Sequence, residues 1–118
     1  AGVLAPNGKI YFPPCDAAQV LVVDPRESTV EVLGPELQGS AKYTGAGVLA
    51  PDGKIYFAPS SAPHILVVDP HASTAAMLGP DLQINRRGAN YAAAGVLAPN
   101  GKIYFAPCDA LHTLVIDP

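Results

Sequence analysis

The strongest constraint on the fold is that the chain repeats itself. Residues 1–12, 46–57 and 94–105 are three copies of one segment; the first and third are identical, and the second differs only in having Asp52 in place of Asn. The copies begin 45 and 48 residues apart. A period of this length is typical of arrays in which each unit folds alike and buries its apolar sides against its neighbours. We therefore divide the chain into units at 1–45, 46–93 and 94–118.

Gly and Pro interrupt each unit every few residues, and the segments between them suit short β-strands. In the first unit the expected strands are residues 2–5, 9–12, 20–23 and 29–33. The apolar run at 20–23 predicts a strand that is covered on both faces, and the alternation at 29–33 predicts an outer strand with one wet face. The third unit reaches only its third strand, at 114–116, which we expect to be an unpaired edge.

The turns between these strands carry their own signals. The sequence Pro6-Asn7-Gly8 is typical of a tight hairpin turn, because Asn and Gly tolerate the positive φ that such turns need. Asp24 precedes Pro25, so its carboxylate is expected to accept hydrogen bonds from the turn that follows. The same Asp-Pro pair recurs in the other two units, at Asp69 and Asp117, and we interpret all three as turn formers.

A unit of about 40–50 residues with four antiparallel strands is typical of a β-propeller blade. Helical repeats would need long apolar patterns of period 3.6, which Gly and Pro preclude here, and a β-sandwich would not require the repetition. The predicted fold is all-β: a β-propeller fragment of about two and a half four-stranded antiparallel blades. Propellers use about 4–8 blades, so this chain alone does not close the ring. We expect a segment of a longer polypeptide or association with a second copy.

A family resemblance supports this fold. The segment from Gly2 to Tyr11, followed by Val20-Leu21-Val22-Val23-Asp24, resembles the YVTN-type and PQQ-like β-propeller repeats. The resemblance implies that the first strand of each blade lines the central channel and that the fourth lies at the rim. It also implies that ligands bind at the face formed by the loops between strands two and three and by the linkers between blades.

Eight polar or aromatic residues of those loops are the candidate ligand-binding set. Tyr43 and Tyr91 could stack on a sugar or a partner side chain or could pack between blades, and Arg86 and Arg87 could clamp an anionic group or be solvated. The complete set is Asp16, Tyr43, His64, Arg86, Arg87, Tyr91, Asp109 and His112.

No residue of this set predicts catalysis, a metal site or a cofactor. His64 and His112 hold equivalent positions, but a zinc site needs three or four converging ligands. The pairs Cys15-Asp16 and Cys108-Asp109 imitate a nucleophile beside a base, yet a carboxylate is too weak a base for an ordinary thiol. The two cysteines are a whole blade apart, too far for a disulfide within the chain. The first strands carry only Gly, Val, Leu and Ala, so no metal cage can be built from them.

Composition excludes two classes of partner. The net charge is −3 and the basic residues are scattered, so nucleic acid is not expected. No apolar run approaches the ~20 residues that cross a bilayer, and nothing in the sequence assigns a compartment. We therefore predict a non-enzymatic scaffold whose loop face binds a protein or a glycan. The alternatives are a part of a larger propeller enzyme, of lactonase, hydrolase or quinoprotein type, with its active residues in other blades, and a purely structural subunit.

Overall fold

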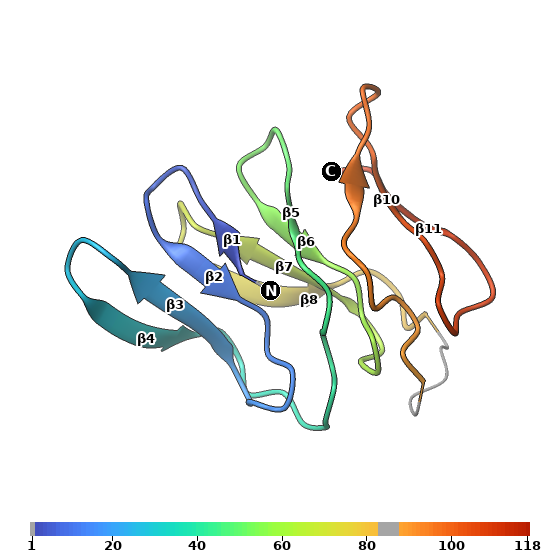
Figure 1. Cartoon of the computed structure of the whole chain (residues 1–118), viewed down its shortest axis with the longest axis horizontal. Helices are drawn as coiled ribbons and strands as arrows, with labels where there is room; N and C mark the ends of the chain where they lie inside the picture. The colour runs from blue at the N-terminus through green and yellow to red at the C-terminus, as the bar shows by residue number, and fades with distance from the viewer. Residues whose placement is uncertain (1, 83–87) are drawn as a thin grey trace.

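The computed structural model describes residues 2–82 and 88–118, and every regular element in these ranges is a β-strand. The strands form separate antiparallel sheets that lie side by side (Figure 1). We call them blades 1, 2 and 3. Blade 1 contains β1 (Val3–Leu4), β2 (Ile10–Phe12), β3 (Val20–Asp24) and β4 (Thr29–Leu33); blade 2 contains β5 (Val48–Leu49), β6 (Ile55–Phe57), β7 (Ile65–Asp69) and β8 (Thr74–Leu78); blade 3 contains β9 (Val96–Leu97), β10 (Ile103–Phe105) and β11 (Leu114–Ile116).

Each sheet runs in chain order from its first strand to its last, so neighbouring strands are joined by local connections. The predicted all-β architecture of four-stranded antiparallel units is therefore confirmed, including a last blade that has three strands in the described residues. In blade 3, β11 pairs only with β10, as expected of an edge strand. No described residue belongs to a helix that could cross a membrane.

The turns form as their residues predict. Gly8 has the expected positive φ, 85°, whereas Asn7 does not; instead, the Asn7 Oδ1 atom accepts a hydrogen bond from the Lys9 amide at 2.9 Å. The Asp24 Oδ1 atom accepts from the amides of Arg26 and Glu27 at 3.0 and 3.3 Å. The Asp69 carboxylate does the same in blade 2. These local bonds stabilise each hairpin without help from other blades.

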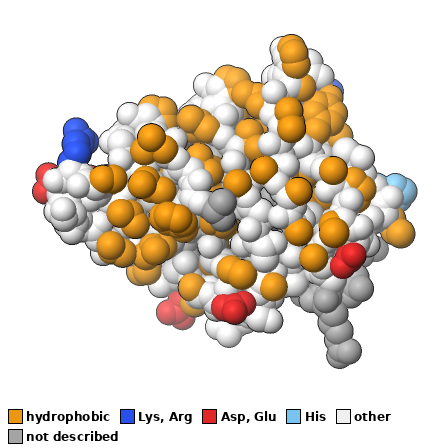
Figure 2. Space-filling view, in the orientation of Figure 1, with side chains coloured by type: hydrophobic (Ala, Val, Ile, Leu, Met, Phe, Trp, Pro, Cys, Tyr) orange, Lys and Arg blue, Asp and Glu red, His pale blue; other side chains and the backbone are white. Residues whose placement is uncertain are grey.

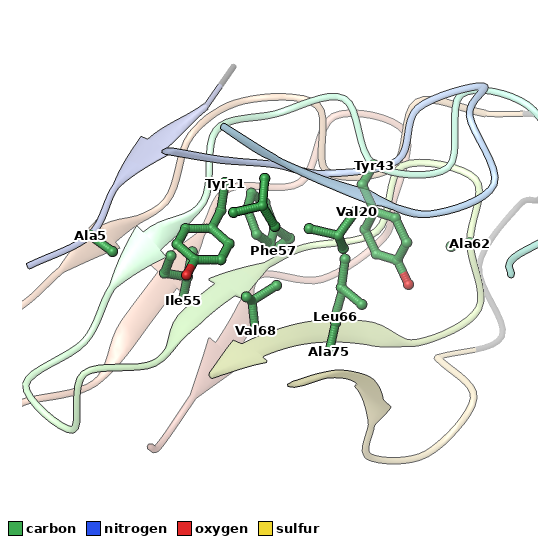
Figure 3. Close-up of a cluster of buried hydrophobic side chains, with 11 residues drawn as sticks. Ala5, Tyr11, Val20, Tyr43, Ile55, Phe57, Ala62, Leu66, Val68 and Ala75 are labelled. Carbon is green, nitrogen blue, oxygen red and sulfur yellow. The ribbon is translucent and has the colours of Figure 1, made fainter. Parts of the chain in front are cut away.

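The core lies between the blades, because alternate residues of each strand face opposite neighbours. Toward blade 2, blade 1 presents Tyr11, Val20 and Val22; the opposing side chains of blade 2 are Ile55, Phe57, Leu66 and Val68, and all of them are buried (Figure 3). A second cluster joins blades 2 and 3, with Tyr56 and Ile65 on one side and Ile103, Phe105 and Ile116 on the other. Blade 2 is thus covered on both faces.

The outer face of blade 1 departs from the sequence prediction. The run at 20–23 was expected to be covered on both faces, but Leu21 is 36% exposed, whereas its blade 2 equivalent Leu66 is 0% exposed. In β4, Val30 and Val32 are 64% and 60% exposed, and Thr29 and Glu31 are exposed too, so both sides of this strand face solvent. The physical reason is that no other sheet of the described residues lies against this face of blade 1.

Candidate functional site

One end of the sheets carries most of the candidate residues. In an antiparallel order, the loop between strands two and three and the linker from strand four to the next blade emerge at the same end. This end, which we call the loop face, therefore holds Asp16, His64, Asp109 and His112 on the loops and Tyr43 and Tyr91 on the linkers. Arg86 and Arg87 lie outside the described residues.

The loop face is held together by a chain of backbone hydrogen bonds that passes from blade to blade. The Lys42 amide donates to the Cys15 carbonyl at 3.1 Å, and the Lys42 carbonyl accepts from the Ser60 amide at 2.7 Å. The next linker repeats this pattern: the Asn90 amide donates to the Ser60 carbonyl at 3.3 Å, and its carbonyl accepts from the Cys108 amide at 2.7 Å. We call this series the linker belt. Each linker joins the loops of two blades.

Asp16 and Asp109 strengthen the linker belt with their side chains. The Asp16 Oδ1 atom accepts from the Ala41 amide, and the Asp109 Oδ2 atom accepts from the Ala89 amide, each at 2.8 Å. In blade 2 the equivalent residue is Ser61, whose hydroxyl donates to the Ser40 carbonyl at 2.5 Å. Both carboxylates are exposed, so each keeps lone pairs that could accept bonds from a ligand.

Tyr43 and Tyr91 lie beneath the loop face. Their side chains are 1% and 5% exposed, and their hydroxyls donate to the carbonyls of His64 and His112 at 2.6 and 2.7 Å. Burial raises the pKa of both phenols above the ordinary tyrosine value. Neither ring is on the surface, so a ligand could contact these rings only after the loops rearrange. In the described conformation the two tyrosines pack between blades and support the loops above them.

The two candidate histidines differ in their surroundings. The Nδ1 atom of His64 lies 3.2 Å from the Gly79 carbonyl, and its blade 1 equivalent Gln19 donates to the Gly34 carbonyl at 2.7 Å. This position therefore ties the loop to the end of the fourth strand. His112 is exposed. Within residues 2–82 and 88–118, no three His, Cys, Asp or Glu side chains are placed to hold a metal ion.

A pocket of about 450 Å³ opens between the two linkers and the blade 2 loop. The described residues of its wall are small, some carry hydroxyls, and none of them is charged: Ser40, Ala41, Thr44, Ser60, Ser61, Gly88 and Ala89. The Thr44 Oγ1 atom is shielded from solvent and has no hydrogen-bond partner. Such a wall suits a neutral ligand that carries several hydroxyl or amide groups.

Sequence reasoning did not identify this pocket. Its one signal was the replacement of the Cys-Asp pair of blades 1 and 3 by Ser60-Ser61 in blade 2, which removes the carboxylate from this position of the blade 2 loop. The pocket walls come from segments up to 49 residues apart, Ser40 to Ala89, and only the packing of the blades brings them together.

Separate antiparallel sheets that pack face to face, with linkers and loops gathered at one end, define the β-propeller class. A solved structure of this class is similar over 99% of the chain: a catalytically inactive virginiamycin B lyase from Staphylococcus aureus, solved with quinupristin. The TM-score is 0.62 and the sequence identity is 16%. This likeness shows the fold. The chain spans 40% of the length of that lyase.

No protein-family model matches the sequence, and no curated protein matches it either.

Proposed function

We propose that this chain is a non-enzymatic binding scaffold of the β-propeller type and that its loop face binds a neutral, hydroxyl-rich ligand of the glycan class. The pocket between Ser40, Thr44, Ser61 and Ala89 carries the proposal. It is large enough for a sugar residue, and its described lining has polar groups and no charged side chain. Binding sites of propeller scaffolds are built on such loops, because the sheets beneath hold the loops in place.

The linker belt supports this proposal. Because each linker is hydrogen-bonded to loops of two blades, the pocket walls are fixed before a ligand arrives, and little ordering is needed on binding. Asp109 and His112 stand exposed on the blade 3 loop, which begins next to the pocket wall at Ala89. They offer a carboxylate and an imidazole to ligand groups that extend beyond the pocket.

The repeat type belongs to the same proposal. We infer that the blades are of the YVTN or PQQ-like type, with boundaries at 45/46 and 93/94, since a Pro-Asn-Gly or Pro-Asp-Gly turn and an aliphatic strand ending in Asp recur in register. In such repeats the framework is shared and the loops choose the ligand.

Filling the pocket tests the proposed function. Ala89→Trp places a large ring at the pocket wall and should reduce binding of glycans, found on a glycan array and measured by titration calorimetry, at least about tenfold, which is about 1.4 kcal/mol. Ala72→Trp, on an exposed turn at the opposite end of the sheets, is the matched control and should bind like the unsubstituted chain.

The same experiments distinguish the proposed function from the other function classes. Binding that Ala89→Trp leaves unchanged would contradict the pocket proposal. Turnover of lactones, esters or quinoprotein substrates would favour an enzyme. A protein partner recovered by pull-down and lost with Ala89→Trp would keep the site and replace glycan by protein as the ligand class.

A further inference from the structure

The outward face of blade 1 is an unbroken apolar surface. Strand pairing places Leu4, Ile10, Val23 and Val30 in one row across the sheet and Phe12, Leu21 and Val32 in the next. None of these seven side chains is charged or polar, and Leu4, Val30 and Val32 are each at least 60% exposed. Figure 2 shows hydrophobic side chains gathered over the part of the surface where blade 1 lies. Apolar patches of this kind usually mark an interaction surface.

The outward face of blade 3 also has an apolar row, beside Lys102 and Asp117 on the same face, but its residues differ from those of blade 1. Val96, Tyr104 and Val115 form one row across β9, β10 and β11. Val96 and Val115 are 65% and 47% exposed, and Tyr104 is half-buried. No charged side chain belongs to this row.

The two open faces are the two halves of an interface that the molecule already makes twice. Between blades 1 and 2, the face with Tyr11 and Val22 packs against the face with Ile55 and Leu66. Between blades 2 and 3, the face with Tyr56 packs against the face with Ile103 and Leu114. Blade 3 ends on the tyrosine side, with Tyr104, and blade 1 begins on the isoleucine and phenylalanine side, with Ile10 and Phe12.

We propose that the blade 1 face of one copy of this chain docks on the blade 3 face of a second copy, head to tail. The repeat makes the fit specific. Ile10 and Phe12 are identical in type and repeat position to Ile55 and Phe57, and Tyr104 is identical in type and repeat position to Tyr11. The contact is heterologous, so an open assembly of any number of copies still has one uncovered face of each kind, and association continues until a ring closes. This assembly is independent of the ligand proposed for the loop face.

Two variants that block opposite faces test the direction of the contact. Leu21→Glu places a charge on the blade 1 face, and Val115→Glu places one on the blade 3 face; each alone should have the mass of a single copy by size-exclusion chromatography with light scattering. Mixed together, they should form a complex of two copies and nothing larger, because one intact face of each kind remains. The unsubstituted chain should have more than the mass of a single copy across a dilution series, namely the mass of the number of copies that closes the ring.

Controls separate docking from misfolding. Leu111→Glu changes a 90% exposed loop leucine outside both faces and should assemble like the unsubstituted chain. Val30→Glu, at a more exposed position of the blade 1 face, replaces Leu21→Glu if the latter loses its β-sheet circular dichroism. A folded, unsubstituted chain that stays a single copy at every concentration would overturn the proposal. So would folded Leu21→Glu and Val115→Glu variants that fail to combine.

Discussion

At the scale of single residues, one substitution between repeats changes the chemistry of a hydrogen bond. In blades 1 and 3 the Asn7 and Asn100 amides donate to the hydroxyls of Tyr11 and Tyr104 at 3.0 Å. In blade 2 the direction is reversed, because Asp52 has no proton to give, and the Tyr56 hydroxyl donates to the Asp52 Oδ2 atom at 2.8 Å. Burial, this hydrogen bond and the nearby carboxylates raise the pKa of Tyr56 from 10.0 to about 12.

This shift predicts a loss of stability in alkali. The folded chain holds the Tyr56 proton more tightly than the unfolded chain does, so the stabilisation is fully present below the unfolded pKa of 10.0 and is lost as the pH rises toward 12. Asp52→Asn removes the carboxylate and leaves the burial, so its unfolding midpoint in urea should fall less steeply over this range. Equal slopes for both proteins would contradict the assigned role of Asp52. The control is Tyr11→Phe, which changes the equivalent tyrosine in blade 1, where Asn7 stands in place of Asp52.

A glycine at the start of each blade sets how closely a phenylalanine packs. A Cβ atom added at Gly47 would lie 2.6 Å from the Phe57 ring, and one added at Gly2 would lie equally close to Phe12. Phe57 is buried between blades and cannot move aside, whereas Phe12 lies on the open face of blade 1.

The two glycines should therefore respond differently to the same change. Gly47→Ala should destabilise the fold by about 1–3 kcal/mol through overpacking. Gly2→Ala should cost clearly less, because the Phe12 ring can turn toward solvent. Urea denaturation measures both free-energy costs. The two substitutions are made in the Leu21→Glu variant, so that no second copy covers the blade 1 face. A cost at Gly2 equal to that at Gly47 would show that Phe12 is as confined as Phe57.

At the scale of elements, the linkers between blades stabilise the fold through buried hydrogen bonds. Asn90 is 0% exposed, and its Nδ2 atom donates to the Ser60 carbonyl at 2.6 Å and to the Gly88 carbonyl at 3.2 Å. Removing a buried donor leaves these carbonyls with fewer partners, which costs about 1–3 kcal/mol. Asn90→Ala should lower the unfolding free energy by that amount in urea denaturation.

The control for this prediction is another asparagine. Asn100→Ala removes exposed bonds in a hairpin turn and should cost less, because water replaces the lost partners. If both substitutions cost the same, the buried side chain of Asn90 adds nothing beyond an ordinary surface hydrogen bond.

The elements also show what a sequence pattern can specify. The positions of the strands and turns in blade 1 were predicted within a residue or two, because Pro6-Asn7-Gly8 and Asp24-Pro25 act through their own backbone geometry. The linker belt was not predicted, since its bonds join the backbone of residues such as Cys15 and Lys42, and backbone groups leave no mark in a sequence.

At the scale of the whole molecule, stability should be uneven. Blade 2 is buried on both faces, while blades 1 and 3 each have one bare face, and in repeat arrays each unit draws its stability from its neighbours. Hydrogen exchange followed by mass spectrometry should therefore find β6 and β7 more protected than their equivalents β2 and β3, although the sequences are almost the same. Equal protection in a variant that cannot associate would indicate that the blades unfold as one unit.

By itself, the sequence determined the repeat, the four-stranded unit and the turns, because these depend on periodicity and on the local conformational preferences of Gly, Pro, Asn and Asp. Only the tertiary structure decided which copies of a repeated residue are buried. Leu21 and Leu66 hold the same position in their blades. Leu66 is buried because the sheet of blade 1 lies against it, whereas no described sheet lies against Leu21. The burial of Tyr43 and Tyr91 and the pocket between linkers have the same origin, since they depend on side chains that only the packing of blades brings together.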